Sequence, residues 1–408
     1  MLTHRLPYPP DRGDRIRSFN LLKVLASRYD VSIACTSEET VWLQHHQLLS
    51  TMAKNVAIYP ISPTFSKLKI PGALLRGQAI TPQWHYRQGL ADTIAQWHQK
   101  DPFDAVLTFC TGMAQYTKAL MQSIEGLPIP YHILDLVDVD SVKWKSYAKQ
   151  AMAPKKWIYA AEAKNLRKIE ACQENPYDAI TVVSQAEAET YQQHVTKNDK
   201  LHVVGNGVDF KYFGEQPPAK EEKQFNIIFV GVLNYLPNAQ CIEWFVHNVM
   251  KPLRQRNPRV VFQVVGRHPT SKINDLGKIP GVEIIGSVPD VRQYLADASL
   301  VIAPLRIARG IQNKVLEAMS SQRTVVCSPA AAQGIKAEDG KHFFLADKPN
   351  QWVDTIDQLL KDPKQRQAVG QAAREQVIQQ YSWQQALDPM IQLIENRTKK
   401  KPQNESAA

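Results

Sequence analysis

The chain has 408 residues, a length that suits two domains of ordinary size. Apolar residues make up 44% and charged residues 22%, a composition that excludes a disordered chain and indicates a folded globular protein. The net charge of +10 favours anionic partners such as nucleic acid, acidic lipid or phosphorylated small molecules, without choosing among them.

Neither a membrane span nor a secretion signal is predicted. No apolar run approaches the length needed to cross a bilayer, and residues 1–7 lack the continuous apolar core of a signal peptide. The five cysteines are widely spaced and form no CxxC pair, so neither a disulfide framework nor a zinc site is expected. These features predict a cytoplasmic protein.

Short apolar runs alternate with longer amphipathic ones, which predicts an α/β fold with parallel sheets. Only Leu2 and Thr3 precede a turn at 7–10, so the first strand is expected to be very short or truncated, which leaves an upstream start codon open. The other expected strands are 31–35, 56–59, 105–109, 131–134, 179–183, 201–204, 226–230, 260–265, 282–285, 300–303, 324–327 and 343–345.

A polar, proline-containing stretch at 213–224 predicts a linker between two domains. The expected parts are a Rossmann-like domain over 1–212, a second over 225–380, a closing helix over 381–396 that returns to the first domain, and a disordered tail over 397–408. Two doubly wound domains that face each other leave a central cleft, where ligands bind at the carboxyl ends of the strands.

The segment 300–319 predicts a buried strand, a loop with two arginines and a glycine, and a helix that begins near Ile311. The free amides and positive dipole end of a helix N-terminus suit a phosphate. Gly310 would let the backbone approach such a ligand closely.

Charged side chains in this segment fit the same ligand. Lys314 with Arg306 or Arg309 can add charge-assisted contacts to a diphosphate. Glu317 can accept hydrogen bonds from ribose hydroxyls, as acidic residues do in dinucleotide sites. A pair of Lys314 and Glu317 on a solvated helix face is the alternative, and the sequence leaves it open.

In the first half, Gly13 precedes a helix with apolar residues at helical spacing, for which Asp14 is a candidate N-cap. Arg15 and Arg17 then fall in the first turn, where positive charge opposes the helix dipole unless an anion binds nearby. The alternative is a pair of surface arginines without a function.

Three aspartates, Asp135, Asp138 and Asp140, follow the expected strand 131–134. Carboxylates crowded at a strand end raise one another's pKa, which suits a general base for an acceptor hydroxyl. A loop-capping role is the alternative. The D-x-D spacing of Asp138 and Asp140 is not interpreted as a metal motif, because the phosphate-binding signals lie in the other half.

Several motifs, taken in order, resemble glycosyltransferase family 4. The resemblance spans nearly the whole chain, although each motif is short. Segments 7–18 and 138–144 further resemble the sugar transferases associated with PEP-CTERM/exopolysaccharide systems of bacteria. The motifs are NGVD at 206–209 with Tyr212-Phe213, FVG at 229–231, VVG at 264–266, GSVPDV at 286–291, LEAM at 316–319 and YSW at 381–383.

The resemblance implies a GT-B fold, with an acceptor-side N-terminal domain and a nucleotide-sugar-binding C-terminal domain. It departs from the family at Arg309, which stands where the first of two glutamates is usual, and at 233–238, where an Arg and a Lys are usual. Asp138 and Asp140 are the candidate catalytic residues. The candidate donor-binding residues are Gly13, Arg17, Gly231, Val288, Arg306, Arg309, Gly310, Ile311, Gln312, Lys314 and Glu317.

The implied activity is a hexosyltransferase-like transfer from a nucleotide diphosphate sugar to a saccharide or polyprenyl-linked acceptor in exopolysaccharide or other cell-surface glycan synthesis. The donor is a substrate, and neither a cofactor nor a metal is expected. A GT-B nucleotide-sugar epimerase and a non-catalytic membrane-surface scaffold are the alternatives.

The stretch 141–172 combines lysines with Trp144, Tyr147, Trp157 and Tyr159, which suits peripheral contact with anionic lipid at the inner face of the plasma membrane. A solvated helical face explains the stretch equally well. Nucleic acid is not an expected partner, because no recognised binding motif is found.

Overall fold

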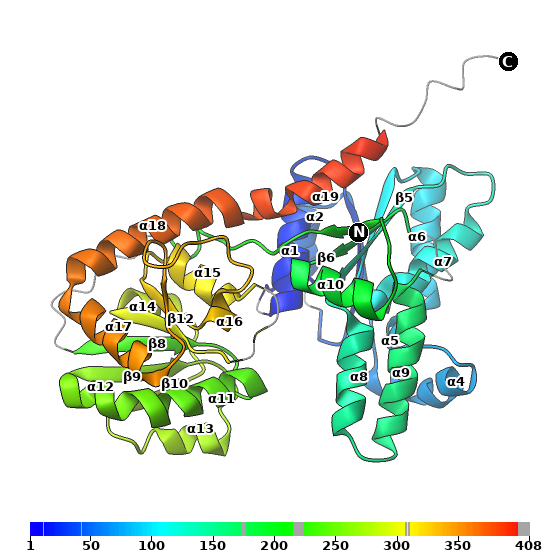
Figure 1. Cartoon of the computed structure of the whole chain (residues 1–408). Coiled ribbons are helices and arrows are strands. Elements are labelled where there is room, and N and C mark those ends of the chain that lie inside the picture. Colours follow the sequence, from blue (N-terminus) through cyan, green and yellow to red (C-terminus); the bar gives the residue numbers. More distant parts are fainter. Residues whose placement is uncertain are drawn as a thin grey trace. The chain divides into compact units, whose positions relative to one another are not determined.

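The computed structural model describes residues 1–10, 12–41, 43–172, 177–214, 224–306, 308 and 311–398 (Figure 1). The chain forms two compact units. The first comprises Met1–Gly205 with Leu387–Ala408, and the second comprises Asn206–Ala386. The second unit is therefore an insertion in the sequence of the first.

The first unit contains a seven-stranded parallel sheet in the order β3-β2-β1-β4-β5-β6-β7. Its inner strands are mostly buried and mostly apolar, as expected for a parallel sheet covered on both faces, although they include buried polar residues such as Thr36 and Asp135. The strands are β1 Leu2–Thr3, β2 Ser32–Ser37, β3 Asn55–Pro60, β4 Ala105–Phe109, β5 Tyr131–Val137, β6 Ala179–Val182 and β7 Leu201–Val203.

Helices connect these strands, and two of them, α8 and α9, form a hairpin that projects from the unit (Figure 1). A short 3₁₀ helix, Thr111–Met113, follows β4. The helices are α1 Gly13–Ala26, α2 Leu43–Ser50, α3 Pro63–Leu68, α4 Ile70–Leu75, α5 Ile80–His85, α6 Gln88–Lys100, α7 Ala114–Ser123, α8 Asp140–Gln150, α9 Lys155–Glu170 and α10 Gln185–His194.

The second unit contains a six-stranded parallel sheet in the order β10-β9-β8-β11-β12-β13. Aromatic side chains fill its core, where the ring of Phe245 lies 4.9 Å from that of Phe262 and 5.8 Å from that of Trp352. The strands are β8 Phe225–Val230, β9 Val260–Val265, β10 Val282–Gly286, β11 Leu300–Ala303, β12 Val325–Cys327 and β13 Phe344–Leu345.

The helices of this unit continue into α19, which belongs to both units because the division falls at residue 386. A five-residue π-helix, Val246–Met250, joins α11 to α12. The helices are α11 Leu236–Phe245, α12 Lys251–Arg256, α13 Ser271–Leu276, α14 Arg292–Ala296, α15 Asn313–Ser320, α16 Pro329–Ala332, α17 Pro349–Lys361, α18 Pro363–Tyr381 and α19 Trp383–Thr398.

Every expected strand is found, with ends within three residues of the prediction. The boundaries between larger parts differ more. Residues 206–212 belong to the second unit, not the first. Tyr381 ends α18, and the closing helix is α19. Most of the expected linker, residues 215–223, and residues 399–408 of the expected tail lie outside the described residues.

Two of the quoted motifs meet inside the second unit, which explains where its boundary falls. The amide of Val208 donates a 2.8 Å hydrogen bond to the carbonyl of Tyr381. A Cβ on Gly207 would lie 2.7 Å from Cα of Trp383, so only glycine fits at this position. The segment after Gly205 is thus anchored to the α18–α19 junction of the second unit.

Candidate functional site

The order of the strands reverses at one place in the second sheet, between β8 and β11. The loops that follow these two strands leave the same edge of the sheet in opposite directions. Ligands of open α/β sheets bind at such a switch point, outside the carboxyl ends of the strands. The loop 231–235 and the described residues of 304–312 follow these strands, and they include the expected donor-binding residues Gly231, Arg306, Ile311 and Gln312.

Two glycines bring the backbone together beside this point. Gly231 and Gly266 follow Val230 and Val265, which are register partners on β8 and β9. A Cβ on Gly266 would lie 1.6 Å from the carbonyl oxygen of Gly231, so a larger residue would push the two loops apart. A Cβ on Gly231 would lie 2.8 Å from Nδ2 of Asn238, which places Gly231 directly against the first turn of α11.

Lys314 joins the helices that follow the two strands. It is the second residue of α15, and its Nζ donates a 2.5 Å hydrogen bond to Oδ1 of Asn238 on α11. The same Nζ lies 4.7 Å from the centroid of the Phe229 ring. Asn238 is fixed in turn, because its Nδ2 donates to the carbonyl of Val232 at 2.8 Å. The N-terminal ends of α11 and α15 therefore meet at the switch point.

The electrostatics of this cluster favour an anion. Burial lowers the pKa of Lys314 to about 8, although Cys241 and Glu317 act in the opposite direction. Burial raises the pKa of Glu317 to about 7, and the charge of Lys314 opposes that rise. The hydrogen-bond partner of Lys314 is a neutral amide, not Glu317, so the structure does not contain the solvated Lys–Glu pair considered above. Both helix N-termini reinforce the preference for negative charge.

The helix after β11 begins later than the sequence predicts. Its first residue is Asn313, not a residue near Ile311, because Gln312 has an extended backbone and serves as the N-cap residue. Ile311 packs against the core of the unit. As a result Lys314 lies in the first turn of α15, where its ammonium group can reach the loop after β8.

The remaining donor-binding candidates of this unit have no contact with the Lys314–Asn238 pair among the interactions described. Arg306 is exposed, with its guanidinium 5.6 Å from the ring of Trp244. Val288 follows β10 and packs against the core of the unit. Arg309 and Gly310 lie outside the described residues.

The structure corrects the role expected for Arg17. Its side chain is 1% exposed, and its Nε and Nη2 donate to the two carboxylate oxygens of Asp135 at 2.9 and 3.0 Å. Its Nη1 donates to the carbonyl of Gly205 at 2.9 Å, and Thr181 donates to Asp135 at 2.8 Å. Arg17 is therefore the cation of a buried ion pair that joins α1 to β5, rather than a residue available to a phosphate.

The corresponding switch point of the first sheet lies between β1 and β4. Gly13 begins α1 here, and a side chain at its position would meet open space. The N-cap of α1 is Arg12 rather than the expected Asp14. Asp14 instead accepts a 2.5 Å hydrogen bond from Nη1 of Arg5 and lies 3.4 Å from Nε2 of His4.

His4 is the centre of this second cluster. Its ring stacks on Phe109 at 5.9 Å and meets the ring of His85 edge-on at 5.4 Å. Burial lowers the pKa of His4, but Cys110 and Asp14 outweigh burial and bring the pKa to about 9. His4 and Arg5 in turn hold the pKa of Asp14 well below its usual range, although burial acts against them.

The two candidate catalytic aspartates have different surroundings. Asp140 is the first residue of α8, accepts a 2.8 Å hydrogen bond from Thr111 and lies 3.6 Å from Nζ of Lys143. These contacts fit the loop-capping alternative. Asp138 reaches solvent, yet its pKa is raised, chiefly because the surrounding protein desolvates its carboxylate. The charge of Asp140 also raises this pKa, whereas the charge of Lys143 lowers it.

The backbone just before Asp138 is strained. Val137 has φ 68°, a left-handed conformation that is rare for a β-branched residue. The pairing of β5 with β6 shifts register at the same place, between Asp135 and Val137. Such an irregularity re-aims the following side chain, and strain of this kind is concentrated at functional sites.

The fold is that of GT-B glycosyltransferases. Sucrose-phosphate synthase from Thermosynechococcus elongatus aligns with a TM-score of 0.66 at 15% identity, over 98% of each chain. HepE from Anabaena, solved in complex with UDP, aligns with a TM-score of 0.60 at 15% identity, over 97% of this chain and 99% of its own. WaaG, a glycosyltransferase involved in lipopolysaccharide biosynthesis, aligns with a TM-score of 0.62 at 14% identity, over 97% of this chain and 99% of its own.

The second unit also matches a family by sequence. Residues 224–362, about a third of the chain, match the family described as Glycosyl transferases group 1. This matched region, 224–362, is named the group 1 domain after that similarity. None of the curated protein sequences matches the chain. The group 1 domain contains the whole cluster at the β8–β11 switch point, from Gly231 and Asn238 to Lys314 and Glu317.

Two residues of these clusters, Asn238 and Cys110, are not among the residues that the sequence predicts. Asn238 of the group 1 domain was noted only within the segment that lacks the family's usual cations. Its signal is the preceding Pro237, which favours a helix start and so places Asn238 in a first turn. Cys110 has no local sequence signal, because the histidine that interacts with it, His4, comes from the loop after β1.

The basic and aromatic stretch forms the α8–α9 hairpin. The rings of Trp144, Tyr147 and Tyr159 contact one another at 5.2 to 6.5 Å, so they hold the two helices together. At the tip, Met152 and Trp157 are 86% and 69% exposed, beside exposed lysines. Among the described helices, none is both long and apolar enough to cross a bilayer.

Proposed function

We propose that this protein is a glycosyltransferase that moves a sugar from a nucleotide diphosphate sugar onto a saccharide or lipid-linked acceptor. The proposal rests chiefly on Lys314. It is a half-buried cation at the switch point of the group 1 domain, and its hydrogen-bond partner Asn238 is a neutral amide. A diphosphate is the ligand that such a cation and two helix N-termini favour.

In the proposed donor complex, Lys314 and the amides at the start of α15 contact the diphosphate. Glu317, in the following turn, accepts hydrogen bonds from the ribose hydroxyls. The same cation would stabilise the charge that develops on the diphosphate as the sugar leaves, and this stabilisation is the main source of rate enhancement. The nucleotide sugar is a substrate, and the proposal includes no cofactor.

Asp138 is proposed as the general base. Its carboxyl group reaches solvent, and its raised pKa suits removal of a proton from an acceptor hydroxyl at neutral pH. Asp140 is assigned to positioning, because Thr111 and Lys143 hold its carboxylate. The transfer is proposed to be hexosyltransferase-like and to serve bacterial exopolysaccharide or other cell-surface glycan synthesis.

The hairpin tip supports peripheral contact with an anionic membrane. Exposed Met152 and Trp157 can enter the interfacial region while the neighbouring Lys155 and Lys156 meet anionic head groups. Such contact would bring a polyprenyl-linked acceptor to the protein at the inner face of the plasma membrane.

A nucleotide panel followed by a transfer assay tests the proposal. The melting temperature is measured with UDP, GDP, ADP and their sugars, because a ligand of the native state raises it by an amount that grows with the ratio of ligand concentration to Kd. UDP is tried first, since HepE was solved with it. The donor that binds is then incubated with and without saccharide acceptors. Acceptor-dependent release of the nucleotide supports transfer, whereas a changed sugar without acceptor would indicate an epimerase, and no nucleotide binding would exclude both activities.

A further inference from the structure

A cysteine and a histidine meet at the carboxyl end of the first sheet, just after the two strands that form its switch point. Thr3 of β1 lies opposite Phe109 of β4 in a parallel register. Continued by one residue, this register brings His4 beside Cys110, at the spacing of about 5 Å that separates neighbouring strands. The thiol of Cys110 acts on the ring of His4 through both charge and hydrogen bonding.

The backbone holds Cys110 in a conformation that is almost exclusive to glycine. Its φ is 64° and its ψ is 162°, a region that costs a residue with a side chain about 1–3 kcal/mol. Its amide donates a 2.7 Å hydrogen bond to the carbonyl of Asp135, and its carbonyl accepts one from the amide of Met113 at 3.2 Å. Cys110 therefore forms a sharp turn between β4 and the helices that follow. Strained strand-to-helix turns of this kind present the nucleophile in other α/β enzymes.

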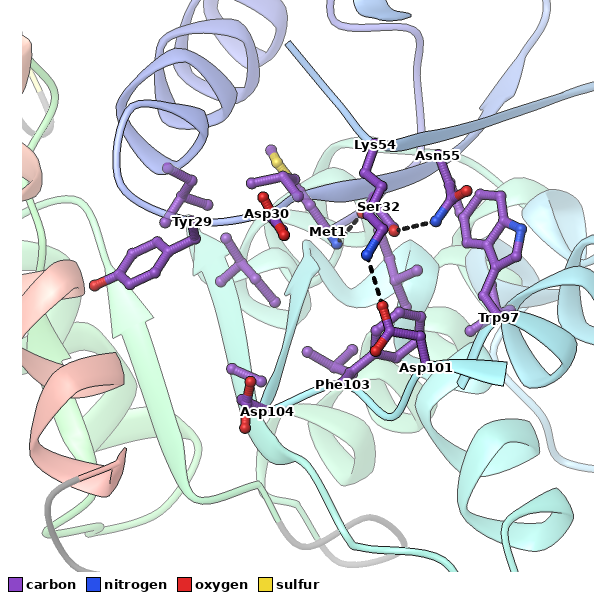
Figure 2. A pocket seen from close by; sticks show the side chains of 18 of the residues that line it. Met1, Tyr29, Asp30, Ser32, Lys54, Asn55, Trp97, Asp101, Phe103 and Asp104 are labelled. Carbon is purple, nitrogen blue, oxygen red and sulfur yellow. Dashed lines mark hydrogen bonds and ion pairs between the residues drawn. The ribbon is translucent and has the colours of Figure 1, made fainter. Parts of the chain in front are cut away.

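Gly112 keeps space beside the sulfur. A Cβ at its position would lie 3.4 Å from Sγ of Cys110 and 3.2 Å from Cδ2 of His85, so a larger residue would crowd the sulfur. Cys110 itself is half-buried, which leaves its thiol within reach of small solutes. The cavity of about 390 Å³ in Figure 2 lies at the opposite, amino ends of the strands, and neither Cys110 nor His4 lines it.

His4 places a positive charge next to this thiol. Its Nε2 lies 3.4 Å from a carboxylate oxygen of Asp14, and its Nδ1 is buried without a nitrogen or oxygen partner among the described residues. Although burial lowers the pKa of His4, Cys110 and Asp14 raise it to about 9, so the ring is an imidazolium at neutral pH. An imidazolium beside a sulfur stabilises the thiolate, which is the form of cysteine that acts as a nucleophile.

The other four cysteines have different surroundings. Cys172 is the best match to Cys110, because it is also half-buried and has a positive φ of 57°. Its Sγ, however, donates a 3.6 Å hydrogen bond to the carbonyl of Glu170, and burial raises its pKa to about 11. Burial also raises the thiol pKa to about 12 at Cys35, Cys241 and Cys327. These four thiols stay protonated at neutral pH.

We propose that Cys110 is a peroxide-sensitive thiol, with His4 as the proton donor. The thiolate sulfur attacks one oxygen of hydrogen peroxide, so that an S–O bond forms while the O–O bond breaks. The sulfur is oxidised by two electrons to a sulfenic acid, and the other oxygen leaves as hydroxide. This hydroxide takes the proton of the His4 imidazolium and departs as water, which leaves His4 neutral.

The oxidised sulfur would lie one residue before Thr111, whose hydroxyl donates a 2.8 Å hydrogen bond to Asp140. Any effect on transfer through Asp140 rests on the proposed function. The oxidation itself does not, and the experiments below measure it directly. They therefore keep their meaning whichever reaction the protein catalyses.

Alkylation of the native full-length chain tests the thiol. Mass spectrometry after brief treatment with iodoacetamide gives the rates at Cys110 and at Cys172, the matched control. We expect Cys110 to react at least about tenfold faster at neutral pH, and the difference to disappear in concentrated urea. Equal rates in the native chain would overturn the proposal, and this comparison needs no variant.

The role of His4 is tested by substitution. His4→Gln should slow alkylation of Cys110 at least about fivefold and leave Cys172 unchanged. His46→Gln, which replaces an exposed histidine of α2, is the control and should change neither rate. An unaltered Cys110 rate in folded His4→Gln would contradict the assignment of His4.

Peroxide supplies the last measurement. The native chain is treated with hydrogen peroxide in the presence of dimedone, which captures sulfenic acids. We expect the adduct at Cys110, at least about tenfold less at Cys172, and none at position 110 in Cys110→Ser. A native chain that is alkylated at Cys110 but gives no dimedone adduct there would overturn the peroxide reaction.

Discussion

The two sheets have switch points of similar construction, but the cations beside them differ in their partners. Those beside the first are paired with carboxylates, and Lys314 beside the second is not hydrogen-bonded to one. Beside the first, Arg17 is paired with Asp135, Arg15 with Glu39, and Arg5 with Asp14. Beside the second, Lys314 contacts a neutral amide and an aromatic ring.

This difference shows that position at a switch point does not by itself make a cation a ligand-binding residue. An arginine that already has an internal carboxylate holds the fold together, because a ligand would have to displace that carboxylate. A lysine whose partner is neutral retains charge for an external anion. The following predictions test this distinction, from the largest expected effect to the smallest.

Replacing Arg17 should destabilise the first unit without affecting the donor site. Arg17→Met leaves Asp135 buried without its partner, which costs about 3–5 kcal/mol. The loss is measured from urea unfolding and from hydrogen exchange in β5 and β6. Arg28→Met is the control, since its exposed pair with Glu395 contributes less than about 1 kcal/mol. Loss of nucleotide affinity in folded Arg17→Met would show that Arg17 contributes to donor binding after all.

Replacing Asp138, the proposed base, should lower kcat more than replacing Asp140, the proposed positioning residue. Asp138→Asn is expected to lower kcat by about 100-fold or more, because an amide cannot accept the acceptor's proton. Asp140→Asn should lower kcat by less than about tenfold, since Thr111 can still hydrogen-bond to the amide oxygen. Initial rates at saturating donor measure both. Equal losses for the two variants would contradict the assignment.

Lys314→Ala should weaken binding of the nucleotide diphosphate at least about 30-fold, equivalent to about 2 kcal/mol. Isothermal titration with UDP, or with the nucleotide that the panel selects, gives the dissociation constant. Lys278→Ala removes an exposed lysine of the same domain, paired with Asp275 at 2.7 Å, and should leave affinity unchanged. An unaltered affinity in Lys314→Ala would mean that the nucleotide binds elsewhere.

The pH dependence of binding should follow the same lysine. Lys314 is cationic below its lowered pKa of about 8, so affinity for the nucleotide should fall as pH rises above 8, by up to about tenfold per pH unit. Titrations between pH 7 and 9.5 test this, and Lys314→Arg should remove the fall because arginine stays charged. A decline that persists in Lys314→Arg would assign the titration to another group.

The sequence predicts the strands well and the side-chain partners poorly. Mostly apolar runs bounded by polar turns identify the strands of the described residues, because the inner strands of a parallel sheet are covered on both faces. The helix begins at Asn313, two residues after the expected start near Ile311, because Gln312 has an extended backbone that no local sequence signal predicts. The LEAM motif located Lys314 and Glu317, but nothing local could show that the lysine would meet Asn238.

The role of Arg17 was not predictable for a related reason. Its partner Asp135 lies 118 positions away, and the pairing depends on α1 packing beside β5. From the sequence alone, an arginine in a first helical turn looks like an anion ligand, and only the fold reveals the buried carboxylate. Long-range charge compensation is thus the main part of the site that local patterns do not contain.

The insertion of one unit into the other has a consequence for synthesis on the ribosome. The first unit needs the last part of α19, where Met390 and Ile391 are buried and Glu395 contacts Tyr29 at 3.4 Å. All residues of the second unit, Asn206–Ala386, emerge before this segment does. The unit that is translated first therefore completes its folding last, and a nascent chain halted before Leu387 would expose apolar surface that chaperones recognise.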